Sequence, residues 1–483
     1  MSTSHAHHPG QITIQVLVFS AVSIVILTGF VLWADTNVRL VFRDADSQTA
    51  FLIAESGIEY YRWHLAHAPN DYQDGAGIPG PYEHEFLDKD GERIGTFTLD
   101  ISPPATGSTL VTIRSTGRID AAPLVEKIIE AQMAIPSFAK YAAVSGSHIR
   151  FSEGSELYGP IHSNAGIRVD GVAHNLVTSA VDEYNDPDHG GGSREFGVHT
   201  HVAPVDPMPP AAVPDRPDVF LAGRQFPVAP LDFFGVSEDL AAMKASAQDD
   251  GWYFPPTAMQ DEGYHIVLKT DDTFDLYEVK KVVKAPNGCV SVLGEKDWGL
   301  WTIDQETFVD NYPFPNNGII MTEDHVWVDG QINTANLTIG AAIFPENSAK
   351  YAHIIVNNDL LYTNYDGQDI IGLIAQGNVS VGWESGDIMR IDGALIAQNG
   401  RVGRYYYKGP GGNQDRCSPY HVRQRLTLYG MIGSNESYGF IFEDGTGYQE
   451  RIIIYDANLL HSAPPKFPKT SNYYTPINWL EIK

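Results

Sequence analysis

Histidine and aspartate gather in one Pro/Gly-rich stretch of the sequence. Its members are Asp186, Asp188, His189, His199 and His201. The alternation of side chains along a strand places His199 and His201 on one face, and two imidazoles with a carboxylate are ligands that Zn²⁺ accepts. Histidines are also common in loops that bind no metal. We therefore expect no metal site and no cofactor from this pattern alone.

Two carboxylates, Asp387 and Asp392, lie close in sequence to Arg390. A polysaccharide hydrolase or lyase needs acidic groups together on one face. These residues, however, flank Gly386 and Gly393, where turn carboxylates are expected for structural reasons. The sequence also lacks the GxSxG, P-loop and HExxH patterns. We therefore predict no catalytic residue and a protein that is not an enzyme.

The two cysteines of the chain are Cys289 and Cys417. They form no CxxC or CxH pattern, so a zinc site built on thiolates is not indicated. A disulfide between them in an oxidising compartment and two separate buried thiols both remain compatible with the sequence.

The 483-residue chain is acidic, with 60 acidic against 32 basic residues and a formal net charge of −28. Nucleic-acid binding requires a cationic face, so we expect no nucleic-acid partner. Hydrophobic residues make up 43 % of the chain, which is enough for a sizeable core. Such a charge balance suits a solvated surface outside the cell.

The elements begin with an apolar run at residues 12–33, and no charged residue occurs before Asp35. At about 1.5 Å per residue, roughly 22 residues span about 33 Å, enough to cross a bilayer. Apolar residues then recur every three to five positions, and no proline occurs between Pro9 and Pro69. We predict one helix over residues 11–66, with a membrane-spanning first half and an amphipathic second half.

This arrangement resembles the class III signal of type IV pilins and type II secretion pseudopilins. The stretch Ala54–Glu59, AESGIE, is similar to a segment of PilX-type minor pilins and of the large tip pseudopilin. The resemblance implies a leader at residues 1–10, which a prepilin peptidase removes after Gly10. Gln11 would then become the N-methylated first residue.

The same resemblance gives Gln15 a meaning. It occupies the fifth mature position, where major pilins carry a glutamate that pairs with the terminal amine of a neighbouring subunit. Glutamine can accept a hydrogen bond but cannot neutralise a charge. The resemblance thus implies a tip position, as for the large pseudopilin; the alternative is one tolerated polar residue in a membrane helix.

Residues 67–135 read as a small sheet behind the helix. Two alternating runs at 93–101 and 108–115 flank a Pro/Gly turn and predict a hairpin, and residues 123–135 predict a third strand. With the helix, this sheet makes the chain α+β.

Residues 136–483 predict a β-rich body with an internal repeat. The segments 159–164, 393–398 and 430–435 share a glycine, an aliphatic residue, a small residue and an amide, and 372–376 is the same with one residue missing. Short strands between them favour stacked coils of a β-solenoid; a β-sandwich is the alternative. A Pro/Gly-rich insertion is expected at about residues 181–260.

We expect a non-enzymatic minor subunit, at the tip or in low copy, of a type IV pilus-like filament that serves assembly and surface adhesion. Its partners would be other pilin subunits, the peptidase, the membrane before assembly, and a surface ligand or glycan. A single-pass membrane protein would thus become part of an extracellular filament. Tyr405–Tyr407 and Tyr473–Tyr474 are aromatic groups for stacking on sugars or packing within strands. The alternative is a membrane-anchored β-helix protein that binds or degrades polysaccharide.

Overall fold

The computed structural model places the chain in two compact units. Unit 1 comprises Met1–Pro103, Val111–Met133 and Pro476–Lys483, and unit 2 comprises Pro104–Leu110 and Ala134–Thr475. The structure describes residues 9–104, 109–187, 194–233, 235–408, 416–437, 439–442 and 444–482, without the side chains of residues 9–11 and 236–239.

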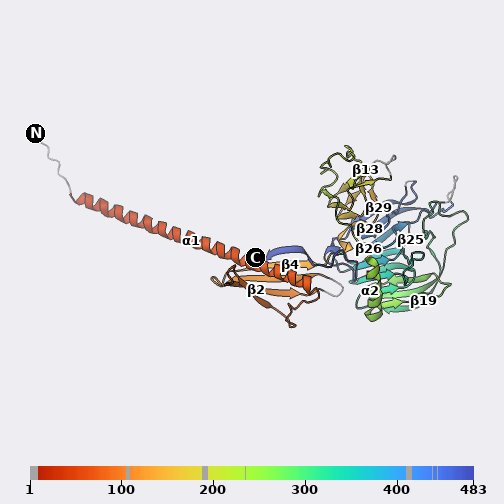
Figure 1. Ribbon diagram of the computed structural model, residues 1–483, viewed down its shortest axis with the longest axis horizontal. Coiled ribbons are helices and arrows are strands. Elements are labelled where there is room, and N and C mark those ends of the chain that lie inside the picture. The colour runs from red at the N-terminus through yellow and green to blue at the C-terminus, as the bar shows by residue number, and fades with distance from the viewer. Residues whose placement is uncertain are drawn as a thin grey trace. The chain divides into compact units, whose positions relative to one another are not determined.

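Unit 1 begins with one continuous helix, α1, Pro9–His67 (Figure 1). The predicted single helix is confirmed. After Pro69, Asp71 holds the end of the helix, because its carboxylate accepts the backbone N–H groups of Gln73 and Gly75 at 2.8 and 2.7 Å and lies 3.1 Å from Nε2 of His64. These backbone hydrogen bonds lower the pKa of Asp71.

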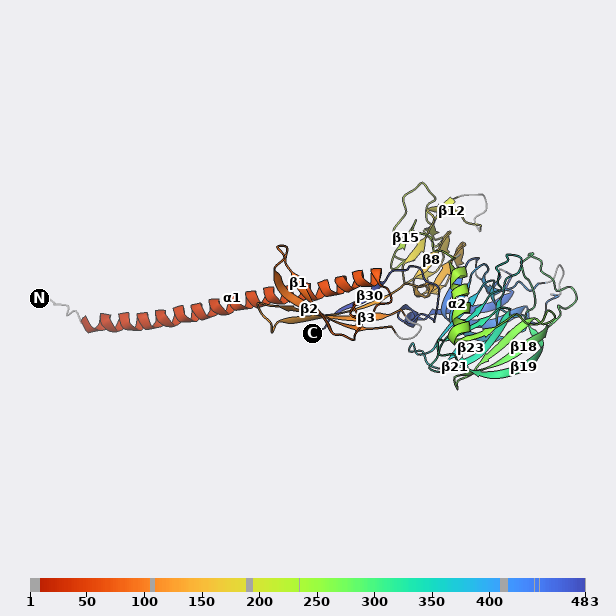
Figure 2. The ribbon, with the colours of Figure 1, turned by 60° about the horizontal axis from the view of Figure 1, so that its bottom comes forward.

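An antiparallel sheet, in the order β1-β2-β3-β4-β30, completes unit 1 (Figure 2). The three predicted strands are present as β2, β3 and β4, and two further strands were missed. The last strand, β30, lies beside β4 although more than three hundred residues separate them in the chain. The bounds are β1 Tyr82–Leu87, β2 Arg93–Ser102, β3 Val111–Ile119, β4 Glu126–Ala134 and β30 Thr475–Ile482.

The second half of α1 packs on this sheet through a stripe of buried residues. At about 1.5–3 kcal/mol per large apolar side chain, this stripe supplies much of the stability of unit 1. Two glycines, one on the helix and one on the sheet, allow α1 to approach the sheet closely. A Cβ atom at Gly57 would lie 2.3 Å from Oγ of Ser115, and one at Gly117 would lie 2.2 Å from the carbonyl oxygen of Ala50. The stripe consists of Ala50, Ile53, Ala54, Ile58, Tyr61 and Leu65.

Replacing Gly57 by valine should separate α1 from β2 and β3 and lower the free energy of unfolding of unit 1 by about 1–3 kcal/mol. The measurement is hydrogen exchange of peptides from β2 to β4 in the detergent-solubilised chain. Gly29→Val is the matched control, because an added Cβ there meets nothing within 4 Å. Equal protection in both variants would contradict this account of the packing.

Unit 2 contains a series of parallel strands, called here the first ladder. Its pairings run from β16 through β20, β22, β24, β26, β28, β5, β8 and β11 to β15. The bounds are β16 Trp252–Phe254, β20 Ile319–Thr322, β22 Asn336–Ala341, β24 Ile370–Ala375, β26 Ile388–Ala397, β28 Val422–Ser434, β5 Ala143–Ser145, β8 Ile161–Ser163, β11 Val177–Ser179 and β15 Arg224–Gln225.

The sequence repeat coincides with the register of this ladder. Leu373 pairs with Leu395, and Leu395 pairs with Ile432, as the repeated segments align. Ile432 then pairs with Ala143, which pairs with Ile161. The glycine–aliphatic–small pattern therefore marks equivalent positions on successive strands.

Serine hydroxyls link neighbouring strands of the first ladder at the turns that follow these strands. Oγ of Ser163 donates to the carbonyl of Ser147 at 2.7 Å and accepts the N–H of Ala165 at 2.9 Å. One strand further along, Oγ of Ser179 donates to the carbonyl of Ala165 at 2.7 Å. Each such bond contributes about 1 kcal/mol and fixes the small residue of the repeat at its position.

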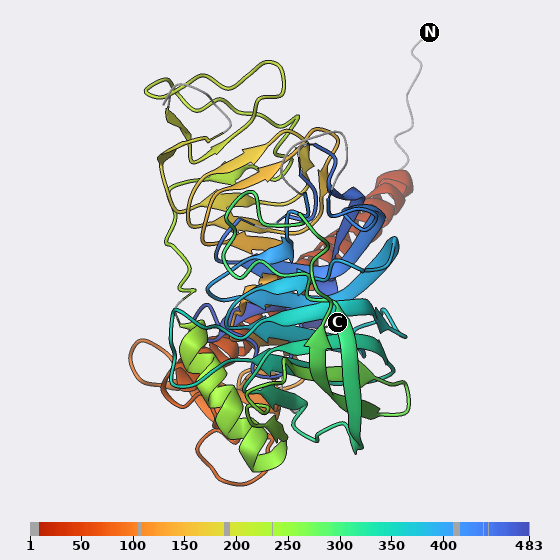
Figure 3. The same cartoon turned by 90° about the vertical axis from the view of Figure 1, so that its right-hand side faces the viewer.

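The chain does not fill the first ladder in sequence order. It enters at β5, proceeds to β15, passes through α2 (Val236–Asp250) and resumes at β16, so that β28 finally pairs with β5. Figure 3 shows the blue C-terminal strands between the yellow and the green ones. The helix α2 lies within the region predicted as a Pro/Gly-rich insertion. Leu240 and Met243 are buried against β20 and β22, where Gly340 leaves room for the Met243 sulfur.

A second parallel series runs from β17 through β21, β23 and β25 to β27, and β18 and β19 form an antiparallel extension of β17. Smaller pairings are β6-β9-β14, β7-β10 and β12-β13, and β29 pairs with β28. The bounds are β17 Gly263–Leu268, β18 Thr273–Val282, β19 Ile303–Pro313, β21 Val326–Ile332, β23 Ile354–Tyr362, β25 Val379–Val381, β27 Val402–Arg404, β29 Gly447–Tyr455, β6 Ile149–Phe151, β7 Glu156–Leu157, β9 Ile167–Val169, β10 Val172–Ala173, β12 Glu183–Asn185, β13 Arg194–Phe196 and β14 Val198–His199.

Cys289 and Cys417 form a disulfide that closes a loop across 128 residues. Both are buried beside Trp383, Tyr405 and Tyr407. In the chain-entropy description, a loop of this length stabilises the folded state by about 4–5 kcal/mol. Such a bond persists in an oxidising compartment.

A buried imidazole, His265, lies between two carboxylates in unit 2. Its Nδ1 is 2.7 Å from Oε2 of Glu306, and its Nε2 is 3.2 Å from Oδ2 of Asp329. Burial lowers the pKa of His265, but the hydrogen bonds to Asp329 and Glu306 outweigh it and raise the pKa to about 9.

The raised pKa of His265 makes the stability of unit 2 depend on pH. Its contribution is complete below the unfolded pKa of about 6.5 and is lost as the pH rises through about 9. His265→Gln should lower the free energy of unfolding by about 2–4 kcal/mol at pH 6 and have little effect above pH 9. Thermal unfolding at a series of pH values measures this, and parallel pH profiles for wild type and variant would contradict it.

Candidate functional site

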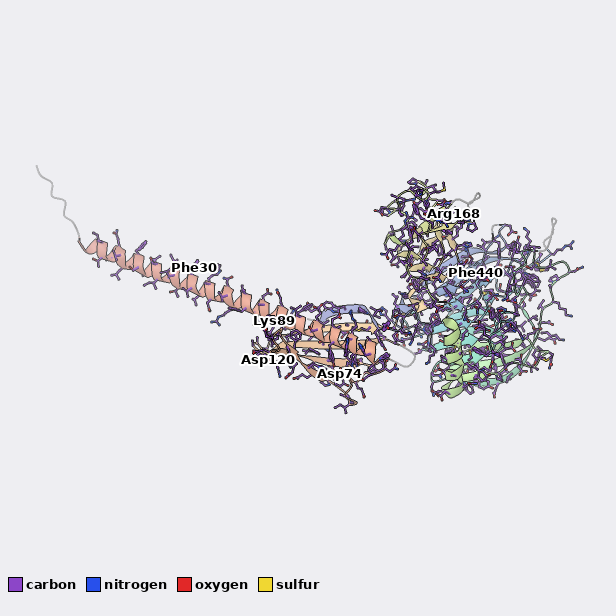
Figure 4. The ribbon with its side chains drawn as sticks, in the orientation of Figure 1. Phe30, Asp74, Lys89, Asp120, Arg168 and Phe440 are labelled. Atoms are coloured by element: carbon purple, nitrogen blue, oxygen red, sulfur yellow. A yellow bond between two sulfur atoms is a disulfide. The ribbon has the colours of Figure 1, made fainter. Side chains whose placement is uncertain are left out.

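The first half of α1 exposes apolar side chains on every side. Within Ile12–Trp33 the large apolar side chains are 52–75 % exposed. Phe30 is one of them and projects from the bare helix in Figure 4. A run of this length and composition is able to cross a membrane, and none of its apolar stretch is buried. The structure therefore leaves a large apolar surface that requires a non-aqueous environment.

Polar groups along this half are arranged in ways that suit lipid. Oγ1 of Thr28 donates to the carbonyl of Ile24 at 2.8 Å, so the hydroxyl needs no external partner. Beyond Trp33, Asp35 and Arg39 form an ion pair of 2.8 Å one turn apart. The change from apolar to charged residues defines one boundary of the membrane-spanning segment.

Three residues of the predicted processing and assembly site belong to α1. Gly10 and Gln11 are helical, and Gln15 is exposed one turn after Gln11. Their roles in cleavage and assembly stay predictions.

The carboxylates considered for catalysis are engaged in structural contacts. Asp392 is fully buried; one of its oxygens lies 2.7 Å from Nε of Arg390, and the other accepts the Tyr365 hydroxyl at 2.7 Å and the Tyr362 N–H at 3.0 Å. Asp387 accepts the backbone N–H of Gln424 at 3.1 Å. The two carboxylates therefore fix strands and turns in this structure.

The tyrosines considered for sugar binding differ in their exposure to solvent. Tyr405, Tyr407 and Tyr474 are buried, whereas Tyr473 is exposed. Tyr406 donates its hydroxyl to Asp444 at 2.8 Å. Stacking on a sugar would thus use Tyr473 or the part-exposed Tyr406, and Tyr405 and Tyr407 serve the core around the disulfide.

Three of the histidine and aspartate candidates come together in unit 2. Asp186 follows β12, and His199 and His201 lie at and just after the end of β14. One ligand atom from each lies within 4.8 Å of the others. Asp188 and His189 lie outside the described residues. Burial lowers the pKa of His199 to about 4, so its imidazole is neutral at neutral pH.

Sequence reasoning missed the contribution of Gly57. The AESGIE stretch was noted only as a resemblance, whereas its glycine is the point of closest contact between α1 and the sheet. The available signal was a glycine within the apolar stripe of an amphipathic helix, which is costly for the helix unless close packing requires it.

Comparisons with known proteins add little. No protein-family model and no curated protein sequence matches the chain. Among solved structures it is similar to the competence-associated pilin ComZ from Thermus thermophilus, with a TM-score of 0.31 and 12 % sequence identity over 90 % of this chain and 97 % of that chain.

A charge in the middle of the apolar half should prevent stable membrane insertion. Arginine in place of Ile24 costs about 2.5–3.5 kcal/mol at the centre of a span. Leu52→Arg is the control, because Leu52 is 56 % exposed on α1 beyond the span. Carbonate extraction of membranes should release a larger fraction of Ile24→Arg than of wild type or Leu52→Arg. Full retention of Ile24→Arg would show that this segment does not span the bilayer.

Proposed function

We propose that this protein is a minor subunit of a type IV pilus-like filament, at its tip or in low copy. The observation that carries the proposal is the division of one continuous helix. Its first half exposes apolar side chains all round, and its second half packs on a small antiparallel sheet. A helix of this kind can leave lipid and bury its apolar half among like helices of other pilin subunits.

The size of unit 2 favours a low-copy position. Unit 2 extends from Ala134 to Thr475 and holds most of the chain. A body of this size on every subunit would crowd the surface of a thin fibre. The protein first resides in the membrane with a single span and afterwards belongs to the extracellular filament.

Gln15 supports the tip position in particular. Without an acid at the fifth mature position, the subunit cannot neutralise the terminal amine of a neighbour in the apolar bundle. An unpaired charge there is costly, so a position with one helical neighbour fewer is favoured. The leader ends at Gly10, the peptidase cleaves before Gln11, and Gln11 is N-methylated.

The function of unit 2 is non-enzymatic and concerns assembly and adhesion. Its parallel registers and the coincidence of the repeat with the first ladder support a β-solenoid. Such a body presents a long rigid surface to a ligand or glycan outside the cell. The engaged state of Asp392 argues against hydrolysis at that carboxylate.

Mass spectrometry of the N-terminal peptide tests the proposal. The mature protein should begin at methylated Gln11, and Gly10→Val should keep residues 1–10 and be absent from sheared filaments. Gly29→Val, a glycine replacement in the same helix, should still lose residues 1–10. A mature wild-type protein that still carries Met1 would refute the pilin function.

A further inference from the structure

A buried three-residue cluster in unit 2 has the composition of a metal site. It contains Asp186, His199 and His201, and is called here the Asp-His-His cluster. The side chain of His199 is fully buried and that of Asp186 is 4 % exposed. Nε2 of His199 lies 3.4 Å from Oδ2 of Asp186, and the ring centroids of His199 and His201 are 5.1 Å apart.

His199 provides the strongest evidence for a metal ion at the Asp-His-His cluster. Among the residues that the structure describes, neither Nδ1 nor Nε2 of His199 has a hydrogen-bond partner. A buried imidazole without hydrogen bonds costs about 1–3 kcal/mol. An imidazole nitrogen is a strong metal ligand, and an ion between Nε2 of His199 and Oδ2 of Asp186 would engage both groups.

The carboxylate of Asp186 lies near one base, and that base makes its shorter contact elsewhere. Arg168 is the nearby base, and its Nε lies 2.8 Å from Asp170, whereas its Nη1 is 3.5 Å from Asp186. The stronger contact of Arg168 is thus with Asp170. Arg168 is labelled in Figure 4. Asp170 also accepts the backbone N–H of His201 at 3.0 Å, which fixes the segment that carries this histidine.

We propose that Asp186, His199 and His201 bind one divalent transition-metal ion, with Zn²⁺ the ion that suits the ligands best. Two imidazoles and one carboxylate favour Zn²⁺ over Ca²⁺, which takes oxygen ligands. Tetrahedral bonds of about 2.0–2.1 Å place ligand atoms about 3.3 Å apart, close to the His199–Asp186 separation. Water would occupy the fourth position.

The ion would add a link between the β12–β13 pair and the three-stranded sheet, which Gly197 already connects by donating its N–H to Asp182 and accepting that of Ile167. Asp186 follows β12, while His199 pairs through β14 with β9 of the three-stranded sheet. Metal binding would therefore hold the β12–β13 pair against that sheet. The role is structural and does not depend on the filament function.

The test uses the full chain in detergent, with His5, His7 and His8 replaced by alanine so that the leader cannot bind metal. After removal of metal by a chelator, titration calorimetry with Zn²⁺ should give one site per chain. Saturating Zn²⁺ should raise the thermal midpoint by about 2 °C or more. Co²⁺ should give the visible absorption of a low-coordinate nitrogen and oxygen site.

Single-residue variants distinguish Zn²⁺ binding at the Asp-His-His cluster from Zn²⁺ binding elsewhere on the chain. His201→Gln, at the half-buried ligand, should raise the Kd for Zn²⁺ at least tenfold and abolish the thermal shift. His174→Gln is the matched control. Nε2 of His174 lies 2.5 Å from Oε2 of Glu156, and His174 does not belong to the Asp-His-His cluster. Asp186→Asn provides a second test if His201→Gln folds poorly. Absence of Zn²⁺ binding by the parent chain, or equal losses in His201→Gln and His174→Gln, would overturn the proposal.

Discussion

The apolar half of α1 cannot stay in water. Its large side chains are 52–75 % exposed between Ile12 and Trp33, and burial of each contributes about 1.5–3 kcal/mol. Summed over the segment, this free energy exceeds the whole stability of a typical domain. The segment must therefore be surrounded by lipid or by other helices. The apolar stripe of the second half of the same helix is already shielded from water, because the sheet of unit 1 covers it.

Both units are completed by strand pairings between distant parts of the sequence. In unit 1 the sheet is finished by β30, at the very end of the described chain. In unit 2 the first ladder is continuous only when β28 pairs with β5, which joins Ser434 to Ser145. Each unit thus depends on pairing between segments that are far apart in sequence, and such pairings cost loop-closure entropy before their contacts form. The disulfide between Cys289 and Cys417 offsets part of that entropy in unit 2.

Much of this organisation could be predicted from the sequence. The helix followed from the absence of proline and from its apolar pattern. The strands β2 and β3 followed from their alternation, and β4 followed from its order and length. The repeat located equivalent strands because a glycine, an aliphatic and a small residue recur at β8, β24, β26 and β28 of the first ladder. The strands β1 and β30 were missed, since Tyr82–Leu87 is short and interrupted by Glu83, His84 and Glu85, and β30 is far in sequence from its neighbour. The entry of the chain at β5 also has no local signal. For the Asp-His-His cluster, the residue types and their alternation were visible, but the burial of His199 and its distance to Asp186 depend on tertiary structure.

The central claim is that the apolar half of α1 exchanges lipid for the helices of other subunits. The most direct measurement is quantitative mass spectrometry of filaments sheared from cells and washed free of membrane with detergent. The account predicts that this chain is present in such filaments, at far fewer copies than the main subunit, and that it begins at Gln11. Recovery of the whole chain in the detergent-extracted membrane fraction, with none in the washed filaments, would contradict it.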